Sequence, residues 1–266
     1  MNVIFGCETI WNNGPTQLLR DIFKITETSG VEQLETAVEQ SKFKWVRPKE
    51  LELWHVYSVL NRPQRMALTK IIKHSDLAKE KLPQKQHYDA VVVLGAATSR
   101  ARVRVEFLIK LYKMGITWDK VYLLGSTRDL RTGKGTDQQM AQTLGNNGIA
   151  PTEIEMVKYT WQEIQMPESL RDIPVQPIQA GERADGNRAE LEDTLAELLK
   201  VAGDIQGKNF LFIANNPYIC FLDAEAKRVL EKSGVNVETV GEEMKAEPME
   251  NVLDAVVKCL INMQRA

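Results

Sequence analysis

The chain has 266 residues, 43% of them hydrophobic and 26% charged, and its formal net charge is -2. These values are ordinary for a folded globular protein, and the near-neutral charge argues against nucleic acid as a partner, because such binding needs a basic face. The sequence lacks both the run of about 18 apolar residues of a membrane-spanning helix and the pattern of a signal peptide. We therefore expect a cytoplasmic protein that associates neither with nucleic acid nor with a membrane.

Residues 1–87 carry apolar side chains at helical spacing and predict a helical cap or subdomain. Helices are expected near residues 15–23, 31–43 and 66–72, with a further helix that starts at Pro48. Proline in a first turn costs little, because its missing N–H would have no helical partner there. Asn61-Arg62-Pro63 is expected to break the helix that starts at Pro48. The region is a candidate surface for a protein partner.

From residue 88 onward, strand and helix patterns alternate. Strands are expected over residues 89–94, 120–125, 153–157, 209–214 and 235–240, and the last of them alternates enough to indicate a sheet edge. Helices are expected near residues 102–114, 138–144, 188–201 and 223–232, residues 159–180 resemble an irregular insertion, and an amphipathic helix closes the chain. This alternation predicts an α/β domain over residues 88–266, with a mostly parallel five-stranded sheet covered by helices on both faces.

The segments that leave these strands hold the candidate binding residues, because open parallel sheets bind ligands outside the carboxyl ends of their strands. The first strand ends at Gly95 just before a helix, whose N–H groups and dipole form a natural anion site. The candidate ligand-binding residues after the strands are Gly95, Thr98, Ser99, Arg100, Arg104, Ser126, Thr127, Arg128, Asn215, Asn216 and Tyr218. Their polar and basic character favours an anion such as a phosphate, a nucleotide or a carboxylate. The alternatives are an ordinary strand–helix turn with exposed arginines and, at Asn215–Tyr218, an asparagine turn that caps the next helix.

The segment before the helix near residues 188–201 adds three candidates. Asn187 joins the ligand-binding set, and Asp185 and Glu190 are candidate acid/base residues. No nucleophile can be identified, and the chain lacks the GxGxxG, P-loop and GxSxG motifs. Cys7, Cys220 and Cys259 are too few and too scattered for a disulfide framework or a metal site, so we expect them to be reduced and predict no metal.

Residues 88–240 resemble the SanA/ElyC/YdcF-like family, a bacterial domain long catalogued as of unknown function. The resemblance is carried by VVVLG at residues 91–95, an R-x-R pattern before a helix ending in LYKMG, VYLLGS at 121–126, NNGI at 146–149, GNRAE at 186–190 and FIANNPY at 212–218. Arg104 falls at the family's spacing from Gly115, and Asn187 with Glu190 matches its Asn-Thr-x-Glu-like segment. The resemblance implies a Rossmann-like fold and a nucleotide-like ligand, with S-adenosylmethionine proposed as the ligand of one branch of the family.

The chain departs from the family pattern at positions that relatives are expected to use. The acidic position after the second strand falls at Thr136, with Asp137 one place along, and the histidine position after the fourth strand falls at Ile219. One hypothesis is a hydrolase or transferase that acts on a phosphate-bearing or nucleotide-like small molecule. The alternatives are a non-catalytic protein that binds a ligand or a protein partner, which the departures favour, and a purely structural protein.

Overall fold

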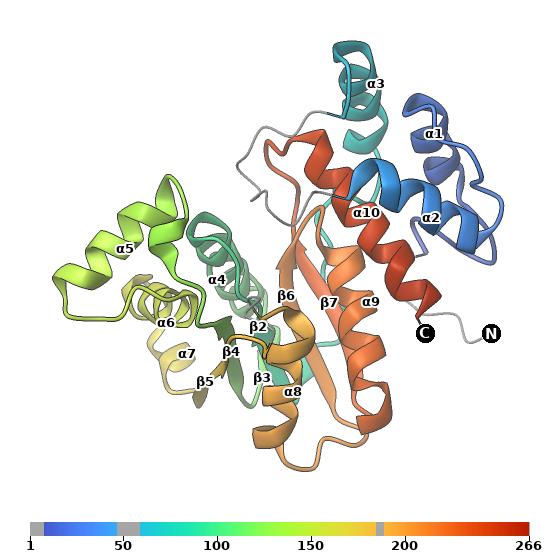
Figure 1. The fold of residues 1–266 in the computed structure, drawn as a ribbon. Coiled ribbons are helices and arrows are strands. Elements are labelled where there is room, and N and C mark those ends of the chain that lie inside the picture. The colour runs from blue at the N-terminus through green and yellow to red at the C-terminus, as the bar shows by residue number, and fades with distance from the viewer. Residues whose placement is uncertain (1–7, 47–58, 185–188, 266) are drawn as a thin grey trace. The chain divides into compact units, whose positions relative to one another are not determined.

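The computed structural model describes residues 8–46, 59–184 and 189–265, drawn as a ribbon in Figure 1. The chain divides into two compact units. Unit 1 consists of residues 1–81, 216–228 and 243–266, and unit 2 consists of residues 82–215 and 229–242. Within the described ranges, no helix is both long and apolar enough to cross a membrane.

Unit 2 is built on a parallel sheet. Its described strands are β2 (Ala90–Val93), β4 (Val121–Ser126), β5 (Val175–Ala180), β6 (Asn209–Asn215) and β7 (Asn236–Glu242), in the order β5-β4-β2-β6-β7. Every neighbouring pair in this sheet is parallel. A short parallel pair, β1 (His87–Tyr88) with β3 (Thr117–Trp118), lies outside this sheet. The predicted α/β, Rossmann-like fold with a five-stranded sheet is confirmed, and β7 lies at an edge as expected.

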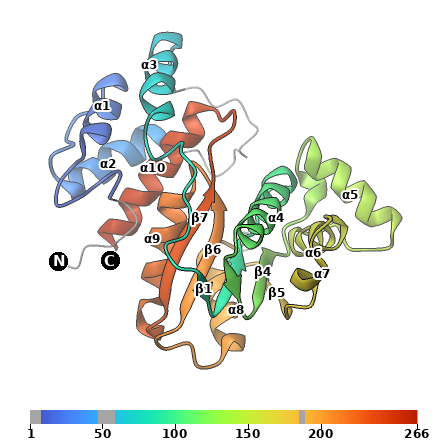
Figure 2. The ribbon, with the colours of Figure 1, turned by 180° about the vertical axis from the view of Figure 1, so that it is seen from behind.

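Helices cover the sheet on both faces (Figures 1 and 2). The helices of unit 2 are α4 (Thr98–Lys113), α5 (Thr136–Asn146), α6 (Glu153–Glu163), α7 (Glu168–Arg171) and α8 (Leu191–Ala202), with a single turn, η1, at Leu130–Thr132. On one face, Val91 and Val93 of β2 share a core with Val105 and Leu108 of α4 and with residues of α6. Helix α8 packs on β4 and β5 from the other face. Each residue of β2 is buried, as expected for a central strand covered on both sides.

The predicted strand over residues 153–157 is wrong, because these residues form the first turns of α6. The buried positions Ile154, Val157 and Trp161 repeat at helical spacing once the window extends past residue 157. The side chain of Thr152 caps the helix by accepting a hydrogen bond from the backbone N–H of Glu155. The fifth strand is instead β5, in the region expected to be an irregular insertion. Its proline, Pro177, is tolerated because β5 is an edge strand.

Unit 1 is helical. Its described helices are α1 (Gln17–Ile25), α2 (Leu34–Trp45), α3 (Arg62–Lys73), α10 (Met249–Gln264) and α9 (Ile219–Leu230) as far as Arg228, after which the chain enters unit 2 and forms a single turn, η2 (Glu231–Ser233). Asn61 and Gln64 form a capping box, so the segment expected to break a helix begins α3. The helix predicted from Pro48 lies outside the described residues. Helix α10, which the sequence interpretation grouped with the Rossmann-like part, packs on α2 in unit 1.

The cysteines were expected to be reduced, and this is wrong for Cys259. Cys259 of α10 is disulfide-bonded, whereas Cys220 of α9 carries a thiol. Both are buried in the core of unit 1. The prediction was wrong because it rested on the separation of the cysteines along the chain, whereas the packing of helices decides which cysteines lie close together.

Candidate functional site

The strand order of unit 2 defines where its sheet can bind a ligand. The chain starts the sheet at β2, continues to β4 and β5 on one side, and then returns to β6 and β7 on the other side. Strand order therefore reverses between β2 and β6, which is the pattern of doubly wound dinucleotide-binding sheets. The carboxyl ends of β2 and β6, both in unit 2, lie at this reversal, which is the position expected for a ligand.

Arg104 holds the ends of β2 and β6 together. It belongs to α4 and is buried, with 3% of its surface exposed. Its Nη1 donates to the carbonyl oxygens of Leu94 at 2.8 Å and Gly95 at 2.7 Å, and its Nε donates to Oδ1 of Asn215 at 3.0 Å. A guanidinium group suits this position because its donors are fixed in a planar fork. The reversal point thus carries a rigidly held positive charge.

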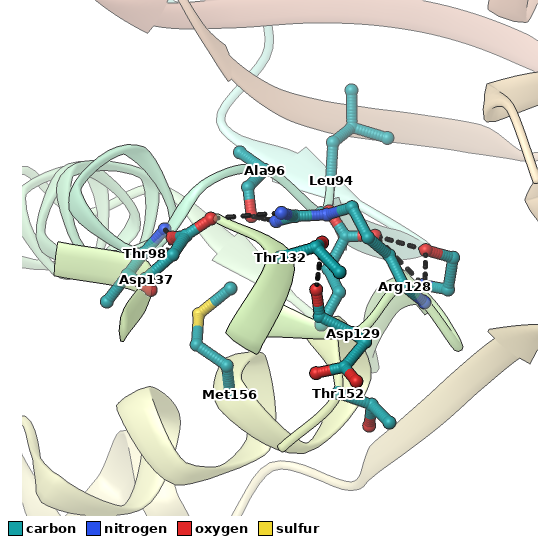
Figure 3. A network of polar contacts seen from close by, with 12 residues as sticks. Leu94, Ala96, Thr98, Arg128, Asp129, Thr132, Asp137, Thr152 and Met156 are labelled. Carbon is teal, nitrogen blue, oxygen red and sulfur yellow. Dashed lines mark hydrogen bonds and ion pairs between the residues drawn. The ribbon is translucent and has the colours of Figure 1, made fainter. Parts of the chain in front are cut away.

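The N-terminus of α4 is occupied by a carboxylate of the same chain. Oδ1 of Asp137 accepts hydrogen bonds from the backbone N–H of Thr98 at 2.7 Å and from the Thr98 hydroxyl at 2.8 Å (Figure 3). Ala97, the residue that precedes the helix, supplies no side-chain cap. The negative charge of Asp137 lies at the positive end of the helix dipole, where it is stabilising. A negative charge does lie at the N-terminus of this helix, as expected, but it is the carboxylate of Asp137 and not a bound anion.

Arg128 connects Asp137 to the turn after β2. Its Nη1 lies 2.9 Å from Oδ2 of Asp137, and its Nη2 donates to the carbonyl oxygen of Ala96 at 3.4 Å (Figure 3). The Arg128 and Asp137 side chains are only 11% and 2% exposed. A buried carboxylate is expensive unless it is paired and hydrogen-bonded, and Asp137 meets both conditions.

Glu153, at the start of α6, holds the end of β4. Its Oε2 accepts hydrogen bonds from the Ser126 hydroxyl at 2.5 Å and from the Ser126 backbone N–H at 3.1 Å. Its Oε1 lies 3.9 Å from Nη2 of Arg128. A Cβ atom at Gly95 would lie 2.8 Å from the carbonyl oxygen of Leu124 and 3.1 Å from Oε1 of Glu153, so this turn leaves no room for a side chain. Two carboxylates and two guanidinium groups therefore surround the turn after β2.

Unit 2 thus links six of the residues singled out in the sequence, namely Gly95, Thr98, Arg104, Ser126, Arg128 and Asn215. Ser99 is exposed and Arg100 half-buried in the first turns of α4. Thr127 donates its backbone N–H to the carbonyl oxygen of Ala180 and so extends the pairing of β4 with β5.

The other predicted site residues that the structure describes lie outside this network. Asn216 belongs to unit 1, where its side chain donates to the carbonyl oxygens of Asp76 and Lys79. Tyr218, also in unit 1, donates to Glu247 at 2.7 Å. Glu190 precedes α8, forms a capping box with Asp193, and is exposed beside Arg183. Asp185 and Asn187 lie outside the described residues.

The sequence interpretation missed the roles of Asp137 and Glu153. Asp137 was noted only as a neighbour of the position that is acidic in the resembling family, and Glu153 was placed in a strand. The Thr152-x-x-Glu155 pattern, typical of a helix N-terminus, could have placed Glu153 in a first turn beside the end of β4. Nothing in the sequence indicated that Asp137 would turn toward α4.

Both hydroxyl groups of the described network are engaged, because Ser126 donates to Glu153 and Thr98 donates to Asp137. Across the described ranges, no group of three or more His, Cys, Asp or Glu side chains could hold a metal ion. No model of a known protein family matches the chain, and no curated protein matches it either. The resemblance to the SanA/ElyC/YdcF-like family therefore stays a prediction.

Proposed function

We propose that unit 2 binds an anionic, nucleotide-like small molecule at the reversal between β2 and β6, without turning it over. The observation that carries the proposal is the buried guanidinium of Arg104, which is fixed by the carbonyl groups at the end of β2 and by Asn215 at the end of β6. A positive charge is thus built into the place where doubly wound sheets bind their ligands. S-Adenosylmethionine is a candidate through its adenosine and its carboxylate, while its sulfonium and ammonium groups make its net charge positive.

The small residues that follow β2 support the same position. Ala96 and Ala97 are each half-buried and present only a methyl group, so a ligand can approach the backbone closely at these two residues. The Asp137 carboxylate already occupies the N-terminus of α4. The anionic group of a ligand is therefore expected beside the end of β6 rather than on the N–H group of Thr98.

Binding without turnover is favoured because Glu190, one of the two candidate acid/base residues, is committed to capping α8 and is 64% exposed at its side chain. A hydrolase or transferase activity that uses Asp185 stays a prediction. Turnover assays with each ligand that binds would decide between the two.

Thermal unfolding in the presence of ATP, AMP, S-adenosylmethionine, a sugar phosphate and inorganic phosphate tests the proposal. A ligand at about 100 times its Kd stabilises the protein by about 2.7 kcal/mol, which is readily measured. We expect at least one nucleotide-like compound to raise the melting temperature and inorganic phosphate to act more weakly. If no compound of this panel changes the melting temperature, the proposal is wrong.

Calorimetric titration of three variants locates the site. Arg104→Lys keeps the charge but loses the planar fork, and we expect its affinity to fall about tenfold, equivalent to about 1.4 kcal/mol. Arg102→Ala is the matched control, because Arg102 lies on the same helix but is exposed and paired with Glu106. Asp137→Asn should leave the affinity unchanged. A large gain in affinity in this last variant would instead place the anion at the N-terminus of α4.

A further inference from the structure

An open hollow lies on the surface of unit 2, between α4 and the segment that follows α6. Its volume is about 520 Å³, and its lining includes the side chains of Ile109, Met114 and Ile164. Ile109 and Ile164 are 6% and 5% exposed and form the floor, whereas Met114, the residue that follows α4, is 50% exposed. The hollow therefore presents an apolar surface to solvent.

Basic side chains surround this apolar floor. Lys110 and Lys113 of α4 line the hollow. Arg102 also lines it, but its charge is balanced by Glu106, whose Oε1 lies 3.0 Å from the Arg102 Nε. The dipole of α4 favours lysines in its last turn, but it does not call for apolar side chains beside them. An apolar centre with a polar rim is instead the arrangement of a protein interface.

Both walls of the hollow are held in place by the core of unit 2. Ile109 and Ile164 belong to one apolar cluster, in which α4 packs against α6 (Figures 1 and 2). The segment after α6 is fixed further by Arg171, whose Nη2 donates to the carbonyl oxygens of Gln162 at 3.3 Å and Ile164 at 3.1 Å. Because the surface is preformed, little conformational entropy is lost on this side when a partner binds.

We propose that this hollow is a docking surface for an acidic segment of a partner protein. An apolar side chain of the segment lies over Ile109 and Ile164, and carboxylates of the segment face Lys110 and Lys113. Charge complementarity identifies the partner, because a basic rim attracts acidic sequences and repels basic ones. The hollow is too open to enclose a small molecule, as small-molecule sites do. Nucleic acid needs more phosphate contacts than two lysines supply.

The length of the hollow fits a short segment. Arg102 and Lys113, both of which line it, are separated by about 16 Å along the axis of α4, a length that an extended segment of about five residues spans. Lys113 lies about 14 Å along the same helix from Arg104. None of the described residues that line the hollow belongs to the proposed ligand site, so docking of a partner does not depend on that ligand.

Fluorescence anisotropy with the full chain and three labelled synthetic peptides tests the proposal. The acidic peptide, of about 16 residues or about 24 Å as a helix, carries leucine on one face and glutamate on the other. The basic peptide replaces each glutamate by lysine, and the polar peptide replaces each leucine by glutamine. We expect only the acidic peptide to bind. Its affinity should be lower in about 1 M than in about 0.1 M NaCl, because salt shortens the Debye length from about 10 Å to about 3 Å.

Single variants locate the bound peptide. Lys113→Glu should weaken binding of the acidic peptide about fivefold, because it replaces an attraction by a repulsion. Met114→Gln should also weaken binding, through loss of apolar contact. The matched controls are Lys200→Glu and Val201→Gln on α8, which packs on the other face of the sheet. Lys200 and Val201 are 65% and 45% exposed, and both control variants should bind the peptide as the wild type does.

The wild-type chain alone can overturn the proposal. It is wrong if the acidic peptide does not bind, or binds no better than the basic or the polar peptide. It is also wrong if the two variants of α4 bind the acidic peptide as the two control variants of α8 do. Self-association of the chain that Lys113→Glu abolishes would assign the surface to a second copy, and binding to anionic lipid vesicles that the same variant abolishes would assign it to a membrane. Either result would replace the acidic partner segment.

Discussion

Removing either partner of the ion pair between Arg128 and Asp137 should destabilise unit 2 far more than removing an exposed pair in the same loop. Both side chains are buried, and Asp137 also accepts two hydrogen bonds from Thr98. The neighbouring pair of Arg131 with Asp129 is shorter, at 2.6 Å against 2.9 Å, but the Arg131 side chain is 71% exposed. Burial rather than distance decides the energy, because water screens an exposed pair and replaces a lost partner.

The magnitude follows from what each substitution leaves behind. Asp137→Ala leaves the Arg128 guanidinium buried without this partner and the N–H group of Thr98 uncapped, for which we expect a loss of about 3–5 kcal/mol. Arg128→Met keeps an apolar stem of similar length but leaves the carboxylate without its guanidinium, with an expected loss in the same range of about 3–5 kcal/mol. In the double variant neither charge is stranded. The two losses should therefore fall short of additivity by about 2 kcal/mol.

Hydrogen exchange measured on the peptides of β2 and β4 is the suitable assay. It reports opening of unit 2 itself, whereas a single unfolding curve of a two-unit chain need not be two-state. Arg131→Ala is the matched control and should leave exchange in these strands unchanged. Losses below about 1 kcal/mol in both single variants, or full additivity in the double variant, would refute the argument that this pair is a buried structural element.

Two further substitutions test the packing and the titration of unit 2. Gly95→Ala should lower the free energy of unfolding in urea by about 1–3 kcal/mol, because its Cβ would lie 2.8 Å from the carbonyl oxygen of Leu124. The control Gly145→Ala within α5, whose Cβ would have no atom within 4 Å, should instead raise it by about 0.5–1 kcal/mol. Equal effects of the two variants would contradict this geometry. Burial, and after it the hydrogen bond donated to Glu238, raises the pKa of Tyr88 above the usual value of about 10. This contribution is complete below about pH 10 and is lost as the pH rises through the folded pKa, so the stability advantage of the wild type over Tyr88→Phe should shrink above pH 10, and a constant difference would exclude the effect.

The sequence predicted the sheet where local pattern and tertiary burial agree. The run that ends at Gly95 and the run that ends at Ser126 are almost continuously apolar, which is typical of a strand covered on both faces. It failed at residues 153–157, since five residues are too few to separate a period of two from a helical period. It also failed at β5, because Pro174 and Pro177 remove the usual signal of a strand, and only the edge position makes them acceptable.

The side-chain network was less predictable than the fold, because its contacts join distant residues. Thr98 and Asp137 are 39 residues apart, and Arg104 and Asn215 are 111 residues apart. Helix starts and strand ends can be located from local residues, and they indicated that polar groups gather after β2 and β4. Which carboxylate meets which guanidinium depends on how α4, α5 and α6 pack, and no local rule contains that information.

Helix α4 shows how far a local electrostatic argument extends. The N–H groups and the dipole of a helix that starts directly after a strand favour a negative charge, and a carboxylate does lie there. The source of that charge is not fixed by the helix itself, and here it is Asp137 in the first turn of α5. Because this position is filled, the positive charge of the proposed ligand site is that of Arg104, on the β6 side of the same turn. An anion that binds beside Arg104 need not compete with Asp137. Titrations of Asp137→Asn and Arg104→Lys therefore distinguish binding at the N-terminus of α4 from binding beside Arg104.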